Sequence, residues 1–99
     1  MLKTKQIVYL RSMAQKIKPV MQIGKDGLNE NSLETILAYL YKHELMKISI
    51  LQNSPIEEDD IKDFIYGYDI EFIEKKGRTI VLYKPNPKLK DSIKLPQVK

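Results

Sequence analysis

Residues 18–28 read Lys18-Pro19-Val20-Met21-Gln22-Ile23-Gly24-Lys25-Asp26-Gly27-Leu28, an apolar strand that breaks into a Gly-x-x-Gly turn and then opens a helix. Glycine has no Cβ atom, so Gly24 and Gly27 let the backbone adopt left-handed or crowded conformations without steric cost. Backbone N–H groups at the start of a helix attract anions, and a ribose-phosphate can lie against them. The stretch therefore predicts a strand-turn-helix unit with a candidate anion site at the turn.

Hydrophobic periodicity predicts a helix on each side of this unit. Apolar residues recur every three or four positions from Thr4 to Ile17, with Thr4 placed to cap the helix and Pro19 to stop it. After the turn, Asn29 is a suitable N-cap for a second helix that ends near His43. The first helix carries basic residues on its outer face, so a basic surface leads towards the glycine turn.

The second half of the chain alternates strand and helix signals. Met46 to Ile50 alternate apolar and polar residues, as in a strand. Ser54-Pro55-Ile56-Glu57 has the pattern of a capping box with proline at the first helical position, which predicts a third helix. Residues 70–74 and 79–83 read as the two strands of a hairpin with a basic tip.

These elements predict one compact α/β domain with the order αβαβαββ, in which three helices pack on a four-stranded mixed sheet in two or three layers. We expect the domain to cover residues 1–84. Residues 85–99, which contain three prolines and four lysines, are predicted to form an extended basic C-terminal tail.

Composition restricts the class of protein. The chain has 99 residues, 42% of them hydrophobic and 30% charged, as expected of a soluble globular domain. No apolar run approaches a membrane span, and no signal peptide is indicated. The chain has no cysteine, which excludes disulfides and thiolate metal sites and fits a reducing compartment. We therefore expect a cytoplasmic protein.

Charge is unevenly distributed along the chain, although the net charge is only +4. Residues 1–25 hold six basic residues and no acid, and residues 75–99 hold eight basic residues against Asp91. Residues 53–74 hold eight acids against Lys62. If the fold brings the two basic ends onto one side, the local field is that of a polyanion-binding protein. Otherwise these lysines are solvated surface residues.

The sequence offers little for catalysis. His43 is the single histidine and lacks the second histidine that a helical zinc site needs. The serines show no nucleophile-elbow context, and no phosphate-loop or dinucleotide fingerprint is present. A small acyl-phosphate hydrolase fits the size but needs an arginine where this turn has Lys25. We therefore expect no enzymatic activity, cofactor, metal or small-molecule substrate.

Linked motifs along most of the chain resemble the CRS1-YhbY (CRM) family of RNA-binding domains, in its bacterial stand-alone form. The matching segments are Lys18-Pro19-Val20, Ile23-Gly24-Lys25-Asp26-Gly27-Leu28, His43-Glu44-Leu45-Met46-Lys47, Gly77-Arg78-Thr79-Ile80-Val81-Leu82-Tyr83-Lys84 and Ile93-Lys94-Leu95-Pro96. The resemblance implies a fold similar to the C-terminal domain of translation initiation factor 3. It also implies binding to ribosomal RNA in precursors of the large ribosomal subunit.

The resemblance places the family's Gly-x-x-Gly loop on Gly24 to Gly27 and its basic positions on Lys18, Lys25 and Lys84. Together with the basic first helix, the predicted RNA-binding residues are Arg11, Lys16, Lys18, Gly24, Lys25, Asp26, Gly27 and Lys84. We expect a monomer that binds ribosomal RNA during assembly of the large subunit, without a membrane partner. The alternative is a protein-interaction module that docks on a translation or assembly factor through its acidic third helix.

Overall fold

The computed structural model describes residues 2–90 and 92–96. Within these residues the chain forms three helices and four strands, and their order confirms the predicted αβαβαββ. The elements are α1 (Thr4–Ala14), β1 (Met21–Ile23), α2 (Glu30–His43), β2 (Leu45–Ile50), α3 (Glu58–Ile65), β3 (Glu71–Lys76) and β4 (Thr79–Tyr83). The strands form a mixed sheet in the order β1-β2-β4-β3, with β1 parallel to β2 and the other neighbours antiparallel.

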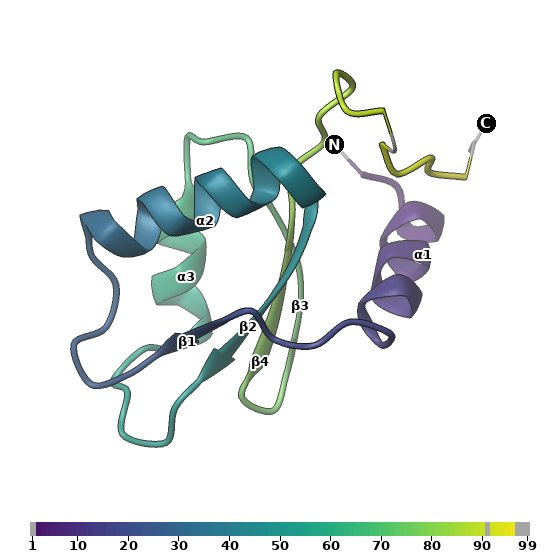
Figure 1. The fold of residues 1–99 in the computed structure, drawn as a ribbon. Coiled ribbons are helices and arrows are strands. Elements are labelled where there is room, and N and C mark those ends of the chain that lie inside the picture. Colours follow the sequence, from purple (N-terminus) through teal and green to yellow (C-terminus); the bar gives the residue numbers. More distant parts are fainter. Residues whose placement is uncertain (1, 91, 97–99) are drawn as a thin grey trace.

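The sheet lies between two helical layers (Figure 1). α2 and α3 cover one face, whereas α1 lies on the other. Successive side chains of a strand point to opposite faces, so Met46 and Ile48 of β2 pack towards α2 and α3 while Leu45 packs towards α1. Of the two arrangements that the sequence left open, the molecule adopts the three-layered one.

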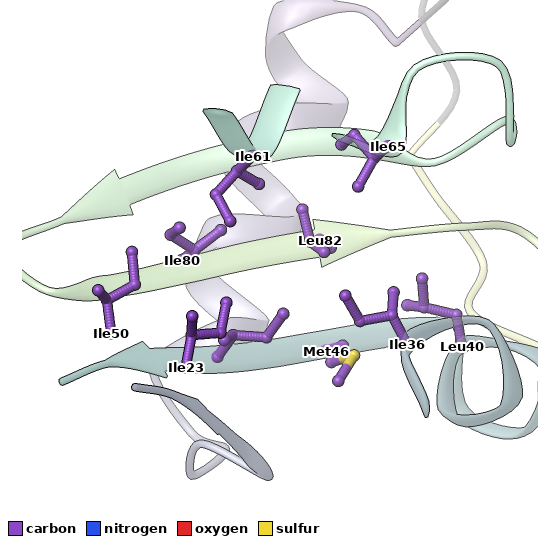
Figure 2. Close-up of a cluster of buried hydrophobic side chains, with 10 residues drawn as sticks. Ile23, Ile36, Leu40, Met46, Ile50, Ile61, Ile65, Ile80 and Leu82 are labelled. Carbon is purple, nitrogen blue, oxygen red and sulfur yellow. The ribbon is translucent and has the colours of Figure 1, made fainter. Parts of the chain in front are cut away.

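The larger hydrophobic cluster fills the space between the sheet and the layer of α2 and α3. Figure 2 shows Ile61 and Ile65 of α3 beside Ile80 and Leu82 of β4, and Ile36 and Leu40 of α2 beside Met46. Complete burial of such a side chain stabilises a fold by roughly 1.5–3 kcal/mol. This cluster fixes β1 and the two inner strands, β2 and β4, and therefore the positions of the loops at their ends.

The smaller cluster joins α1 to the other face of the sheet. Leu10 and Ala14 are buried against Val81 and Tyr83, and Ile93 and Leu95 of the tail pack against the same group. The Gln6 side-chain amide donates to the Pro96 carbonyl at 3.2 Å. The described part of the tail is thus held against the domain, although the predicted boundary after residue 84 remains a prediction.

Glu44 joins α2 to β2 and binds the tail. It is 1% exposed, and its φ of +64° lies in the left-handed region that few side chains adopt. Its carboxylate accepts hydrogen bonds from the Asn86 N–H at 2.7 Å, the Ile93 N–H at 2.6 Å and the Ser92 hydroxyl at 3.0 Å. Its backbone carbonyl accepts from the Lys84 N–H at 2.8 Å. One side chain therefore holds both ends of the described tail.

Three helix boundaries differ from the prediction. α1 ends at Ala14, three residues before the predicted end at Ile17. Thr4 is the first helical residue of α1 and not its cap, because the Gln6 side chain accepts the Lys3 N–H at 2.9 Å. The prediction that Pro55 begins the third helix is wrong, since α3 begins at Glu58. The Asp60 carboxylate accepts the Glu57 N–H at 2.8 Å, so the reciprocal cap lies three residues later than expected.

Candidate nucleic-acid interface

The glycine turn follows β1 directly and is open to solvent at its tip. The Gly27 N–H donates to the Gly24 carbonyl at 3.1 Å, and Gly27 has a φ of +67°. Lys25 and Asp26, between the glycines, are exposed. α2 begins only at Glu30, and the Asn29 side chain accepts the Ser32 N–H at 2.9 Å. Because the helix end already has a cap, the backbone of the turn is the part that is available to a ligand.

Two other loops meet the glycine turn at this end of the sheet, the lower end in Figure 1. The Leu51 N–H donates to the Ile23 carbonyl at 2.8 Å, and a Cβ atom on Gly24 would lie 3.6 Å from the Leu51 side chain. The Ile50 N–H donates to the Arg78 carbonyl at 2.7 Å. The end of β2 therefore lies between the β3–β4 hairpin tip on one side and the glycine turn on the other.

This arrangement adds cations that the sequence did not assign to the site. Lys75, Lys76 and Arg78 belong to the β3–β4 hairpin tip and are exposed. The sequence showed the tip to be basic, but nothing in it placed the tip beside Gly24 to Gly27. The pairing of Ser49 with Thr79, a long-range contact in the sheet, is the signal that could have placed the hairpin tip near the glycine turn.

The basic residues of the first helix lie beside this end, on the α1 face of the sheet. Lys16 and Lys18 are exposed in the segment that leads from α1 into β1. β1 has three residues, so about 10 Å of strand separates this segment from the glycine turn. Arg11 is not free, because its Nε donates to the Glu74 Oε1 atom of β3 at 3.1 Å.

Lys84 lies at the opposite end of the sheet. Lys84 follows Tyr83, the last residue of β4, whereas the glycine turn lies near Thr79, the first residue of that strand. The five residues of β4 span about 17 Å. Its Nζ atom donates to the Tyr68 carbonyl at 2.8 Å. The structure therefore brings Gly24, Lys25, Asp26 and Gly27 together with the hairpin tip but does not bring Lys84 to them.

Part of the α1 face of the sheet is left uncovered next to this basic end. Alternation along the strands directs Gln22, Lys47, Ser49, Lys76 and Thr79 to this face, and α1 ends at Ala14 before it reaches them. We call these five residues the open sheet surface. Its polar side chains contrast with the apolar residues under α1.

Acidic residues gather in and before α3, on the face of the sheet opposite α1, and Glu57 and Glu58 line the same cavity as Lys75 and Arg78 of the hairpin tip. Glu58 pairs with Lys62 at 2.9 Å, and this carboxylate raises the pKa of the lysine above its usual value. Acids in the first turn of a helix also interact favourably with its dipole. In the part of the chain that the structure describes, no group of three or more His, Cys, Asp or Glu residues could hold a metal ion. No helix among the same residues is long and apolar enough to cross a membrane.

Comparison with known proteins assigns the family. The CRS1 / YhbY (CRM) domain matches residues 2–84 of the chain. The chain belongs to the CRM family. This confirms the resemblance that the motifs indicated, and the CRM match includes α1, the glycine turn and the β3–β4 hairpin.

Relatives of this CRM domain match almost its whole length. A Bacillus subtilis protein named "Probable RNA-binding protein YqeI" is 38% identical, over 97% of this chain and 100% of the relative. A Haemophilus influenzae protein named "RNA-binding protein" is 30% identical, over 97% and 96% of the two chains. The solution structure of a Staphylococcus aureus protein matches with a TM-score of 0.72 and 39% identity, over 97% and 100% of the chains.

Proposed function

We propose that this protein binds RNA, without catalysing a reaction, through the end of the sheet that carries the glycine turn. The observation that carries the proposal is that the exposed turn at Gly24 to Gly27 and the basic hairpin tip at residues 75–78 lie at the same end of the sheet, on either side of the end of β2. The names of the two relatives support it. Lysine and arginine side chains neutralise phosphates, and this sequence-independent term supplies much of the affinity of nucleic-acid binding.

In this proposal the turn and the lysines contact the RNA backbone. Bare backbone at Gly24 and Gly27 allows a phosphate to approach closely, and Lys25 supplies the charge beside it. Lys16 and Lys18 extend the cationic surface along the entry to β1. Arg11 retains guanidinium N–H groups besides the one that binds Glu74. Such contacts fix the register of the RNA but carry no base information.

Asp26 and Lys84 have less direct roles. The Asp26 carboxylate lies at the exposed tip and repels phosphate, so it weakens the turn as a clamp. Lys84 contacts RNA only when the RNA extends along the sheet to its opposite end. The proposed interface therefore centres on the glycine turn and the hairpin tip.

We further propose that the RNA is ribosomal and that the protein acts as a cytoplasmic monomer on precursors of the large ribosomal subunit. This part rests on the resemblance to stand-alone CRM proteins. An assembly factor leaves before the subunit works, so the protein should co-sediment with precursors more than with translating ribosomes. Equal occupancy of precursors and mature ribosomes in a gradient would contradict this role.

Salt dependence tests the RNA-binding proposal. If four to six phosphates are neutralised, the affinity for structured RNA falls with salt at a log–log slope of about −3 to −5. The measurement is a titration of purified ribosomal RNA at several salt concentrations. A slope near zero would contradict an electrostatic interface.

A second candidate function is docking on a protein through the acidic side. The observation that favours it is an open cavity of about 530 Å³ lined by Leu28, Pro55, Ile56, Asp60, Asp63 and Phe64. An apolar floor with two carboxylates at its rim suits a basic segment of a translation or assembly factor. Binding to a protein extract without binding to purified RNA would favour this candidate.

A further inference from the structure

A cavity on the α1 face of the sheet lies beside the proposed RNA-binding interface and has no role in it so far. It has a volume of about 370 Å³ and lies between the end of α1 and the β3–β4 hairpin, lined by Ala14, Gln15, Lys47, Glu74, Lys76, Thr79 and Val81. Its volume falls at the lower end of the roughly 300–1,000 Å³ typical of small-molecule sites. We propose that this cavity binds one unpaired guanine base of the RNA, an inference that rests on the RNA-binding function proposed above.

The cavity exists because of the way α1 ends. The Lys47 ammonium donates to the Ala14 carbonyl at 3.1 Å and to the Ile17 carbonyl at 3.3 Å, and so satisfies the last carbonyl of α1 and one in the segment that follows it. The chain then turns away towards β1, and the sheet beyond Ala14 stays uncovered. Val81, which is 2% exposed, forms an apolar part of the lining, and Thr79 adds a half-buried hydroxyl.

Glu74 supplies a carboxylate that is held in place. Its Oε1 atom accepts the Arg11 Nε–H at 3.1 Å, and its side chain is only 20% exposed. In the part of the chain that the structure describes, no donor is bonded to its Oε2 atom. The carboxylate therefore has an acceptor atom left for a ligand in the cavity, and Arg11 acts as a positioning residue for it.

Two ammonium groups line the same cavity. Lys76 lies two residues after Glu74, on the same face of β3. An ammonium has three N–H donors, and the carbonyls of Ala14 and Ile17 use two of those on Lys47. A ligand in the cavity thus meets a carboxylate acceptor with ammonium donors close by.

This arrangement fits the Watson–Crick edge of guanine better than that of the other bases. Guanine presents two adjacent donors, N1–H and the N2 amino group, beside the O6 acceptor. The carboxylate accepts from the donors, and an ammonium donates to O6. Uracil presents an acceptor on each side of its single donor, and adenine has an acceptor at N1. Cytosine has an acceptor at N3 beside its N4 amino group. Each of these three bases can offer the carboxylate one donor but places an acceptor next to that donor, where guanine offers a second N–H.

The position of the cavity suits a base that is splayed out from a bound strand. β1 and β3 are the two edge strands of the sheet, about 14 Å apart at the usual strand spacing. The backbone of a short single strand held at Gly24 to Gly27 can therefore cross the open sheet surface and reach the cavity. Proteins that read RNA sequence mostly bind unstacked bases of loops and bulges in this way.

The test compares RNA hairpins that differ only in one bulged base, with the fully paired hairpin as baseline, at a salt concentration that weakens the phosphate contacts. We expect the protein to bind the bulged-guanine hairpin at least about fivefold more tightly than the bulged-uracil hairpin, the lower end of the discrimination that a bidentate base contact gives. In Glu74→Gln the preference for bulged guanine over bulged uracil should fall below twofold. This ratio is the readout, because loss of the charge that pairs with Arg11 also changes the affinity for every hairpin, the paired one included.

Glu58→Gln is the matched control, because it makes the same chemical change in an ion pair, that with Lys62, on the other face of the sheet and outside this cavity. It should keep the preference. Thr79→Val removes a hydroxyl from the cavity lining without altering the shape of the cavity. It is a second, independent variant for the test if Glu74→Gln does not fold. We expect it to weaken binding of bulged guanine and to leave the paired hairpin unaffected.

The outcomes separate this inference from the proposed function. If the wild-type protein binds every hairpin equally, or if both Glu74→Gln and Thr79→Val keep a guanine preference, the cavity is not a base site while RNA binding stands. A preference for another base would equally overturn the assignment of guanine. If the wild-type protein binds none of the hairpins at any salt concentration, the proposed function itself fails.

Discussion

Gly27 and Glu44 both have a positive φ angle, but their surroundings differ. Their φ angles are +67° and +64°, and each lies where a strand meets a helix. Beside Gly27, the side chains of Lys25 and Asp26 remain exposed. At Glu44, by contrast, the backbone and the carboxylate are all hydrogen-bonded within the molecule.

The difference shows that left-handed backbone alone does not indicate a binding site. What matters is whether the polar groups around it have partners in the fold. The turn at Gly24 to Gly27 keeps its groups available to a ligand, whereas the Glu44 junction uses its own to connect α2, β4 and the tail. Substitutions in the first should alter binding and substitutions in the second should alter stability.

The largest effect is expected for Glu44→Ala. It leaves buried donors of Asn86, Ser92 and Ile93 without an acceptor, and the expected loss of unfolding free energy is about 3–5 kcal/mol. For a domain of this size the melting temperature should fall by roughly 12 °C or more. Thermal and urea denaturation measure this loss of unfolding free energy. The control is Glu34→Ala, which removes an exposed glutamate of α2. A loss as small as that of the control would show that the tail contacts contribute nothing.

Lys25→Asp should have the opposite profile. It creates two adjacent carboxylates where a phosphate is proposed to bind, so RNA affinity should fall by at least ~1.4 kcal/mol, or about tenfold. Because the side chain is exposed, the unfolding free energy should stay within about ±0.5 kcal/mol. Lys88→Asp, an equal charge change in the tail, is the matched control for RNA binding. Unchanged affinity of a stable Lys25→Asp protein would refute the turn as the RNA clamp.

The two glycines of the turn should separate stability from binding. In Gly27→Ala the new Cβ atom would lie 3.2 Å from Ile56 Cδ1, at a positive φ, so we expect a loss of about 1–2 kcal/mol in unfolding free energy. Gly24→Ala meets Leu51 at an ordinary 3.6 Å and should cost little stability, yet its methyl group should weaken RNA binding. Equal melting temperatures of the two variants would contradict this assignment of strain.

The smallest effect concerns Tyr83, which neighbours Glu44. Burial, and next the negative charge of Glu44, raise the pKa of the Tyr83 hydroxyl above its ordinary value of 10.0. The folded state therefore holds this proton more tightly than the unfolded state, and the resulting stability is present below pH 10 and is lost as the pH rises beyond it. Between pH 8 and pH 11, the unfolding midpoint should fall less steeply with rising pH in Tyr83→Phe than in the wild-type protein. Parallel curves would show that the tyrosine does not contribute.

Most of the fold was predictable from local patterns. The hydrophobic periodicity gave the element order, and the cap at Asn29 and the strand at Thr79 to Tyr83 lie where the sequence predicted. The start of α3 was missed because a proline and a serine mimic a cap that Asp60 actually provides. The role of Glu44 could not be predicted, because a glutamate is not a turn signal and its partners lie more than forty residues away.

The candidate site was predictable only in part. The glycine turn is a local feature, so its residues could be named from the sequence. The proximity of the hairpin tip depends on sheet pairing between residues about thirty positions apart, and the distance of Lys84 depends on the direction of β4. Likewise, the pairing of Arg11 with Glu74 joins positions 63 residues apart, which composition cannot reveal.

The contact between the Gln6 side chain and the Pro96 carbonyl at 3.2 Å brings the two ends of the described chain to the same place. Figure 1 shows both ends on the far side of the molecule from the β3–β4 hairpin. A fluorophore, a surface tether or a fused domain attached at either terminus would therefore point away from the proposed RNA interface. The same proximity favours a circularly permuted chain with a short linker between the ends, opened at the exposed turn of Gly77 and Arg78.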